Sequence, residues 1–349
     1  MKFDELLISN FRGIDRAELK ELKSVNLIVG HNNSGKTSIL EAIFLLSGMS
    51  NPELLQIIND TRGLQLKNDN DFKYIFNNLN LKQPISLSGI VSGIKRYAEI
   101  SFYKDNKQSI HKLSSPSDSF RAELLSLQNQ IKDIDGLKIS FKNDDEDEQD
   151  VYISLKNHSI ELSKTYKEAL TLKYLNSQSN LNGRGIKLSP IIKKKKTRDI
   201  VDILRQIEPN LKDIQILENN SIYCDIGEEE LLPIGIMGDG IIKTLAVLSS
   251  MYEIQEGVLL IDEIENGLHY SSLAVFWKAI IMLSKQLNVQ VIATTHSYEA
   301  LGVLSDVIQE LNEKEIAMYR IEKQDNNTNI IHYNNKDFII SLDENYEVR

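Results

Sequence analysis

Cysteine is scarce in this chain, and long apolar runs are absent. Cys224 is the single cysteine among 349 residues, which excludes a disulfide framework within one chain. No stretch of apolar residues approaches the roughly 18 that a membrane-spanning helix needs. The opening MKFDELL has no apolar segment of the kind that directs secretion. These absences predict a cytoplasmic protein that makes no use of a membrane.

An excess of positive charge is missing as well. The 40 lysines and arginines are outnumbered by 50 aspartates and glutamates, which gives a net charge of -10 at pH 7. Such a chain does not coat nucleic acid over its whole surface, although a local basic groove remains open. Lys193–Lys196 is the strongest candidate for such a groove, because four lysines can neutralise phosphates. A solvated loop or helix entry is the other interpretation of these lysines.

Against these absences stands a complete phosphate-binding motif. Residues Gly30 to Thr37 read GHNNSGKT, which has the spacing G-x-x-x-x-G-K-[ST]. The apolar run 25–29 predicts a buried strand before the loop, and 38–46 predicts a helix whose positive end faces the phosphates. Lys36 would reach the β- and γ-phosphates of ATP, and the Thr37 hydroxyl would bind Mg²⁺. The residues expected to contact the nucleotide are Gly30, Asn32, Asn33, Ser34, Gly35, Lys36, Thr37 and Ser38.

A second strand ends in two carboxylates. Val258–Ile261 is uniformly apolar, as expected of a central parallel strand covered on both faces. Asp262 and Glu263 follow it, at the strand end where ligands of open α/β sheets bind. Asp262 would hold Mg²⁺, and Glu263 would orient or deprotonate the attacking water.

A third apolar strand is expected over Val289–Ala293. It is followed by Thr294, Thr295 and His296, so the histidine lies at a strand end. Its imidazole can bind phosphate or water by hydrogen bonds, and its charge responds to its surroundings. A sensor of the γ-phosphate would be useful at this position, and His296 is the catalytic candidate for it.

The order of these segments resembles one group of ATPases. LLISNFRGI, GHNNSGKTSILEAI, LLIDEIENGLH and TTHS look like ABC-type ATPase heads of the SMC, RecF and OLD (overcoming lysogenization defect) group. The segment IENGLH and the earlier GDG look most like the stand-alone OLD-like ATPases, which occur in bacterial anti-phage and abortive-infection systems. The resemblance implies an α/β fold, the P-loop NTPase of ABC-ATPase head type, with two lobes and hydrolysis of ATP with Mg²⁺. It also implies Asp262 and Glu263 as the Mg²⁺ and catalytic carboxylates, His296 as the switch histidine, and Asn266–His269 as the segment that contacts a second subunit.

One stretch departs from the group's pattern. Its members carry a signature near L-S-G-G-Q/E-K, which grips the γ-phosphate of the opposite subunit, whereas this chain reads MGDGIIK from Met237. Gly238 and Gly240 would still expose N–H groups at a helix start, with Lys243 as a nearby cation. The signature serine is missing, and Asp239 would repel phosphate unless it points away or caps the helix. A modified signature acting in trans and a plain helix cap both remain open.

The sequence defines two further site residues less clearly, a basic residue beside the nucleotide and a glutamine that senses Mg²⁺. In relatives a basic residue after Asn-Phe lies beside the nucleotide, which makes Arg12 a candidate. A surface arginine in a turn with Gly13 is the alternative. The glutamine that usually senses Mg²⁺ has no clear counterpart, and Gln56 and Gln83 are the two guesses.

The expected organisation has three parts. Residues 1–110 form the N-terminal ATPase lobe, 111–197 an insertion of helices and an acidic-tipped hairpin, and 198–349 the C-terminal lobe. No sustained heptad pattern separates the phosphate loop from Gly238, so long coiled-coil arms are not expected. No acidic cluster of the OLD nuclease kind follows His296, so the chain is not expected to cut nucleic acid itself. The predicted elements of the middle and end are strands at Ile85–Ile90 and Ala98–Tyr103, helices at Ser119–Ile134 and Ile160–Leu175, a hairpin of Leu137–Phe141 with Val151–Leu155, a linker at Asn176–Pro190, and a final hairpin of Ile316–Glu322 with Asn329–Tyr333.

Two functional hypotheses follow, both with at least a dimer assembled around ATP. In the first, the chain is the sensor or regulator of an anti-phage system and acts with a separate effector such as a nuclease or toxin. In the second, it is a RecF-like DNA-repair ATPase that binds DNA in an ATP-dependent way. A third hypothesis is a binding module in which ATP hydrolysis is only vestigial.

Overall fold

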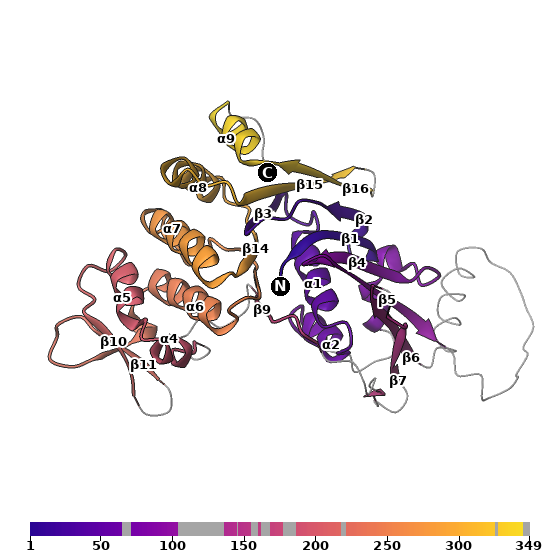
Figure 1. Ribbon diagram of the computed structural model, residues 1–349, viewed down its shortest axis with the longest axis horizontal. Helices are drawn as coiled ribbons and strands as arrows, with labels where there is room; N and C mark the ends of the chain where they lie inside the picture. Colours follow the sequence, from indigo (N-terminus) through magenta and orange to yellow (C-terminus); the bar gives the residue numbers. More distant parts are fainter. Residues whose placement is uncertain are drawn as a thin grey trace, which may run out of the picture. The chain divides into compact units, whose positions relative to one another are not determined.

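The computed structural model of the chain describes residues 1–64, 71–103, 136–144, 146–154, 160–161, 168–176, 186–217, 221–324 and 327–344 (Figure 1). Contacts within the chain divide it into two compact units. The first unit consists of Met1–Glu5, Leu19–Leu40 and Leu170–Arg349, and the second of Leu6–Glu18 and Glu41–Ala169. The phosphate loop, the acidic strand and the histidine strand all belong to the first unit.

The first unit is built on a six-stranded sheet with the order β16-β15-β3-β14-β13-β9. The strands from β15 to β9 run parallel, and β16 pairs antiparallel with β15. Every residue of β3, β13 and β14 is buried, as expected of strands covered on both faces. The strand bounds are β3 Val25–Gly30, β9 Leu172–Leu175, β13 Val258–Ile261, β14 Gln290–Thr294, β15 Ile316–Gln324 and β16 Asn327–Tyr333.

The register of the central strands decides where the functional segments meet. Ala293 of β14 pairs with Ile261 of β13 on one side and with Leu27 of β3 on the other. Because parallel strands end at the same edge, the phosphate loop, Asp262 and Thr294 emerge there together.

Helices cover this sheet and complete the core of the first unit. Figure 1 shows α6, α7 and α8 as neighbours in one layer. Most of α6 is buried, and Trp277 of α7 is fully buried. The Ser297 hydroxyl begins α8 by accepting from the Ala300 N–H at 3.1 Å, a common N-cap arrangement. The helix bounds are α4 Ser189–Lys193, α5 Thr197–Arg205, α6 Asp239–Glu253, α7 Tyr270–Leu287, α8 Tyr298–Leu311 and α9 Asn335–Asp343.

A small antiparallel sheet in the first unit precedes α6. Its strands are β10 Asp213–Ile216, β11 Ile222–Asp225 and β12 Leu232–Pro233, in that order. A short 3-10 helix, Ile234–Ile236, leads from it to the start of α6.

The second unit holds a seven-stranded sheet with the order β2-β1-β4-β5-β6-β7-β8. The strands from β4 to β8 are antiparallel neighbours. The helix α1, which follows the phosphate loop, continues into this unit, and α2 follows it. The bounds are β1 Phe3–Phe11, β2 Ile14–Leu19, α1 Lys36–Ser47, α2 Glu53–Asp60, 3-10 helices Asp71–Ile75 and Asn77–Leu79, β4 Ile85–Val91, β5 Ile94–Tyr103, β6 Gly136–Asn143, β7 Gln149–Ser154 and β8 Ile160–Glu161.

The structure confirms the strands expected around the motifs, the antiparallel pair β4–β5 and the hairpins β6–β7 and β15–β16. The helix expected over Ile160–Leu175 is wrong where the chain is described, because that stretch begins in β8 and ends in β9. Leu172 pairs with Val258 of the buried sheet, and backbone bonding to the sheet there overrides a local helical pattern. The predicted helix at Ser119–Ile134, and most of the predicted linker at Asn176–Pro190, lie outside the described residues. No described helix is both long and apolar enough to cross a membrane.

Candidate functional site

The backbone of the phosphate loop adopts conformations that favour glycine. Gly30 has φ 148°, and a Cβ there would lie 2.6 Å from the Ile321 carbonyl oxygen, so no other residue fits without a shift. Asn33 and Gly35 both have positive φ, at 63° and 108°. Turns of this kind direct successive backbone N–H groups into one concavity that suits an anion.

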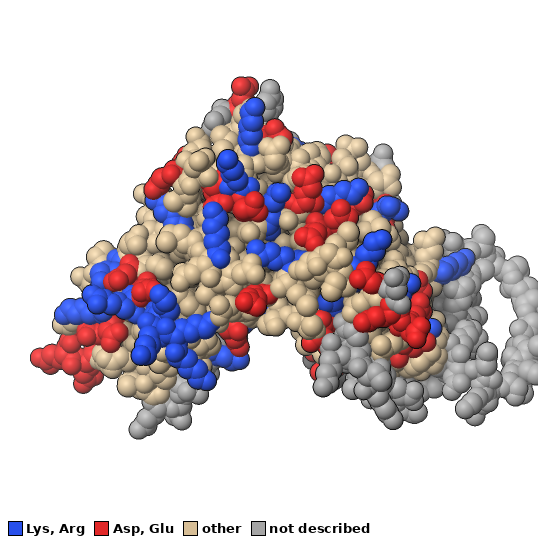
Figure 2. Space-filling view, viewed as in Figure 1, with Lys and Arg blue, Asp and Glu red and all other residues tan. Residues whose placement is uncertain are grey.

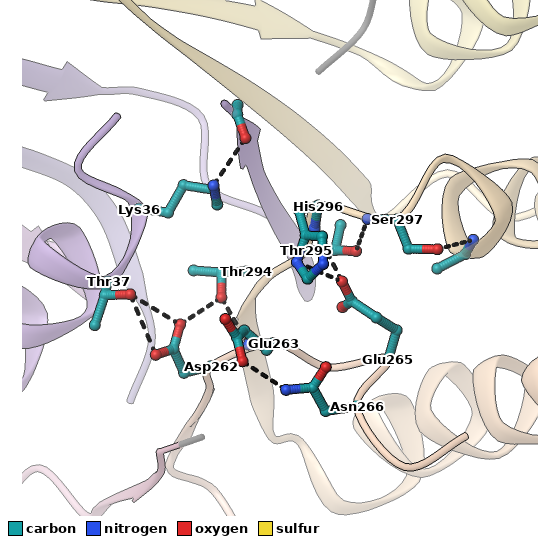
Figure 3. A network of polar contacts seen from close by, with 12 residues as sticks. Lys36, Thr37, Asp262, Glu263, Glu265, Asn266, Thr294, Thr295, His296 and Ser297 are labelled. Atoms are coloured by element: carbon teal, nitrogen blue, oxygen red, sulfur yellow. Dashed lines mark hydrogen bonds and ion pairs between the residues drawn. The ribbon is translucent and has the colours of Figure 1, made fainter. Parts of the chain in front are cut away.

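Lys36 begins α1 directly after this loop. Its ammonium donates to the carbonyl oxygens of Gly30 at 2.8 Å and His31 at 2.9 Å, which holds it over the loop. Figure 3 shows Lys36 on the same side of the site as Thr37. Burial lowers the pKa of Lys36, while nearby carboxylates, that of Asp262 foremost, oppose this shift. Asn32 and Asn33 are exposed at the tip of the loop, and Ser34 and Ser38 are buried beneath it.

A chain of hydroxyl and carboxylate contacts joins the three strand ends. The Thr37 hydroxyl lies 3.2 Å from both carboxylate oxygens of Asp262. Thr294, at the end of β14, donates its hydroxyl proton to Asp262 Oδ1 at 2.6 Å (Figure 3). A hydroxyl and a carboxylate are hard oxygen ligands, and Mg²⁺ usually takes one or two protein ligands together with phosphate and water. Thr37 and Asp262 therefore fit a Mg²⁺ ion held against bound phosphates.

Glu263 is held from two sides in a left-handed conformation. Its φ is 51°, and its N–H donates to the Thr294 hydroxyl oxygen at 2.8 Å. Its Oε2 accepts from the Asn266 side-chain amide at 2.5 Å. The sequence singled out Asn266 only as part of a subunit contact, and Thr294 only as a neighbour of the histidine. The sequence motif places Asn266 close after the acidic pair. The hydrogen bonds of Asn266 depend on the turn after β13, and those of Thr294 depend on the register of β14 against β13.

His296 lies at the end of β14 with its imidazole about half exposed. Its Nδ1 lies 3.1 Å from Glu265 Oε1, and its backbone N–H donates to that same oxygen at 3.0 Å (Figure 3). The Glu265 side chain is only 10% exposed. Sequence reasoning missed Glu265, because only the folded chain brings it to the histidine.

The segment MGDG lies beside the turn that follows the acidic pair. A Cβ on Gly267 would lie 3.3 Å from the Asp239 Cβ, so the two segments touch. Gly238 has φ 34° and precedes α6, whose first residue is Asp239, an acid at the positive end of the helix. Gly238 is the N-cap residue of α6 and no side chain makes a capping hydrogen bond there, so Asp239 does not cap the helix. A signature acting in trans stays a prediction.

Lys243, one turn further along α6, faces inward. It is 4% exposed, and its ammonium is 3.5 Å from the Glu263 carbonyl oxygen. Burial lowers its pKa, and Glu265 is the first of the carboxylates that oppose this shift. Within the chain, Lys243 therefore lies beside the end of the acidic strand.

Arg12 belongs to the second unit, where its charge meets a buried carboxylate. Its Nε lies 2.6 Å from Glu41 Oε2, and it donates to Asn59 Oδ1 at 2.9 Å. The Glu41 side chain is 1% exposed and also binds Arg62. These contacts account for the burial of the arginine, and a nucleotide contact by Arg12 stays a prediction.

The lysines of 193–196 gather at the end of α4 and the start of α5. Figure 2 shows lysine and arginine side chains grouped over this part of the surface. Lys193 and Lys195 are exposed, whereas Lys196 binds Asp199 at 2.7 Å and Lys194 contacts Gln255 and lies 5.7 Å from the centre of the Tyr252 ring. Part of the positive charge is thus compensated within the surface.

Comparisons with known proteins find a matching family model, similar sequences and a similar fold. A family model described as "AAA domain, putative AbiEii toxin, Type IV TA system" matches residues 25–302. An ATP/GTP phosphatase of Helicobacter pylori is 24% identical over 336 residues, which cover 87% of each chain. The DNA replication and repair protein RecF of Haemophilus ducreyi is 54% identical, but only over 46 residues, or 13% of each chain. A solved SMC head, bound to the C-winged helix domain of ScpA, matches in fold with a TM-score of 0.51 at 15% identity, over 96% of this chain and 98% of that one.

Proposed function

The chain belongs to the family described as "AAA domain, putative AbiEii toxin, Type IV TA system", and on this premise we propose how its site works and what it serves. It is an ABC-type ATPase of the SMC/RecF group, and it hydrolyses ATP. The observation that carries the site assignment is the chain of contacts from Thr37 through Asp262 and Thr294 to Glu263. It joins the phosphate loop to the acidic pair.

In the proposed mechanism the backbone N–H groups of the loop and the Lys36 ammonium bind the β- and γ-phosphates. Thr37 and Asp262 would hold Mg²⁺, which supplies charge neutralisation at those phosphates when bound. Glu263 orients the attacking water and accepts its proton as the oxygen bonds to the γ-phosphorus and the bond to ADP breaks. His296 contacts the γ-phosphate from the neighbouring strand end.

We further propose that two copies assemble around ATP. The contact between Gly267 and Asp239 supports this, because it places the segment Asn266–His269 and the start of α6 on one surface. Ile236 and Tyr270, which flank these segments, are 65% and 59% exposed. Apolar side chains left open beside a nucleotide site suit a second subunit.

Light scattering tests the assembly on the variant Glu263→Gln, with and without ATP and Mg²⁺. This variant keeps the phosphate contacts but lacks the base, so the bound state should accumulate and the mass should rise. Lys36→Ala, which lacks the phosphate contact, is the control that should not respond. A mass unchanged by ATP in Glu263→Gln would refute assembly driven by nucleotide.

For the biological role we propose a sensor or regulator subunit in bacterial anti-phage defence, acting with a separate effector such as a nuclease or toxin. The family description, which names a putative toxin and a toxin–antitoxin system, supports this role. Phage should form fewer plaques on cells that carry the gene with its neighbours than on cells that lack them. Glu263→Gln in the same gene cluster should change the number of plaques. Equal plaque numbers on cells with the parental gene and cells with Glu263→Gln would show that the defence does not need ATP hydrolysis.

A RecF-like function in DNA repair is the second candidate. The local identity to a RecF protein and the exposed lysines of 193–196 favour it. Fluorescence anisotropy on gapped duplex DNA tests it. Binding that needs ATP, weakens with salt and is lost when Lys193 and Lys195 become glutamate would support this candidate over the first.

A further inference from the structure

Glu265 is an acid with a side chain only 10% exposed, and the proposed chemistry leaves it without a role. One of its oxygens, Oε1, contacts two atoms of the same residue, the backbone nitrogen and the ring Nδ1 of His296. These two contacts close a small ring that includes the histidine's own Cα and Cβ. An imidazole tied in this way cannot rotate about its side-chain bonds without losing one of the contacts.

The second carboxylate oxygen of Glu265 lowers the stability of the fold. Oε2 is buried and has no hydrogen-bond partner among the described residues. Glu265 acts on two nearby cations: it opposes the burial that lowers the pKa of Lys243, which is 4% exposed, and of Lys36. A buried carboxylate with an unpaired oxygen destabilises a fold, and such costs are typical of groups kept for function.

We propose that Glu265 is a positioning residue for ATP hydrolysis, which fixes the orientation of His296 at the γ-phosphate. With the Nδ1 proton donated to Glu265, the imidazole presents Nε2 away from the carboxylate. The contact from the backbone N–H keeps that direction constant relative to β14, and thereby relative to Asp262 and Glu263 on the neighbouring strand end. Glu265 itself does not touch the nucleotide.

This inference rests on the proposed role of His296, and a double-mutant cycle separates the two. The variants are Glu265→Ala, His296→Ala and their combination, measured as steady-state phosphate release at varied ATP. Glu265→Ala should lower kcat about 100-fold, the loss typical of a catalytic group displaced by about 1 Å. The Kd of a fluorescent ATP analogue should stay within a few-fold, because the phosphate loop is untouched.

The combined variant decides whether Glu265 acts through His296. If it does, removing Glu265 from the His296→Ala protein should lower kcat by less than about 2-fold further. Losses that multiply would mean that Glu265 acts independently, and an unchanged kcat in Glu265→Ala would also overturn the proposal. If His296→Ala itself keeps full kcat, the role proposed for His296 fails first.

Two more variants keep the test independent of folding. Glu265→Gln retains an oxygen that accepts both N–H groups, so it should recover kcat to within about 10-fold of the parent, since a neutral acceptor bonds more weakly than a carboxylate. Glu313→Ala is the matched control, because Glu313 is a 3% exposed acid that also accepts backbone N–H groups but lies after α8, outside the site. It should lower stability without lowering kcat. A Glu265→Gln protein as slow as the alanine variant would contradict positioning by hydrogen bonds.

Discussion

Thr294→Val removes one hydroxyl from the centre of the site and leaves the side-chain shape nearly unchanged. Thr294 is fully buried at the end of β14. Its hydroxyl donates to Asp262 Oδ1 at 2.6 Å and accepts from the Glu263 N–H at 2.8 Å. Valine would pack on the same strand and make neither bond.

The expected cost follows from these two bonds. A hydrogen bond to a charged carboxylate contributes about 1.5–3 kcal/mol, and an N–H left without its acceptor adds about 1 kcal/mol. We expect the free energy of unfolding to fall by about 2–4 kcal/mol, after some relaxation around the new methyl group. Because Asp262 is the proposed Mg²⁺ ligand, losing its partner should also weaken Mg²⁺ affinity about 10–100-fold.

Urea unfolding followed by tryptophan fluorescence measures this cost directly. Trp277 is the single tryptophan and is buried in the same unit as Thr294, so its emission reports the unit that holds the site. Thr294→Ser is the control, since it keeps the hydroxyl and loses only a methyl group, about 1 kcal/mol. Equal destabilisation by valine and serine would refute a role for the hydroxyl. Mg²⁺ dependence of phosphate release on the same proteins gives the second readout.

Three further substitutions test the phosphate loop and the base. Lys36→Ala should weaken ATP binding about 100-fold, because a charged phosphate contact of about 3 kcal/mol is lost. Unchanged binding of a fluorescent ATP analogue would mean that the phosphates bind elsewhere. Glu263→Gln should keep that affinity and lower kcat about 10²–10⁴-fold, because the base is gone, and retained phosphate release would remove Glu263 from this role. Gly30→Ala brings a Cβ within 2.6 Å of the Ile321 carbonyl oxygen. Its ATP affinity and its melting temperature by differential scanning calorimetry should both fall, and parental values for both would contradict the steric requirement.

The sequence was sufficient where a local pattern and a buried strand coincide. The strand before Asp262 is a continuous apolar run, the strand before Gly30 is interrupted only by Asn26, and both lie in the central sheet with all residues buried. The positions that follow them could therefore be predicted to meet at one sheet edge. The antiparallel hairpin β6–β7 was predictable for a related reason, since the segments 137–141 and 151–155 both follow the two-residue period of a strand.

Other features depend on contacts that no local pattern records. Leu172–Leu175 forms a strand because β13 lies beside it, whereas its own sequence suits a helix. Glu265 meets His296 only because the turn after β13 folds back against the end of β14. The two units also interleave in sequence, since Leu6–Glu18 joins Glu41–Ala169 and not its own chain neighbours.

Ala293 of β14 pairs with Ile261 of β13 and with Leu27 of β3. This register decides which side chains of β14 face the carboxylates that follow β13. Residues one step apart on a strand face opposite sides, so a slip of β14 by one residue would turn the Thr294 hydroxyl away from Asp262. The same slip would carry His296 away from Glu265. The register of β14 therefore sets the Thr294–Asp262 and Glu265–His296 contacts together.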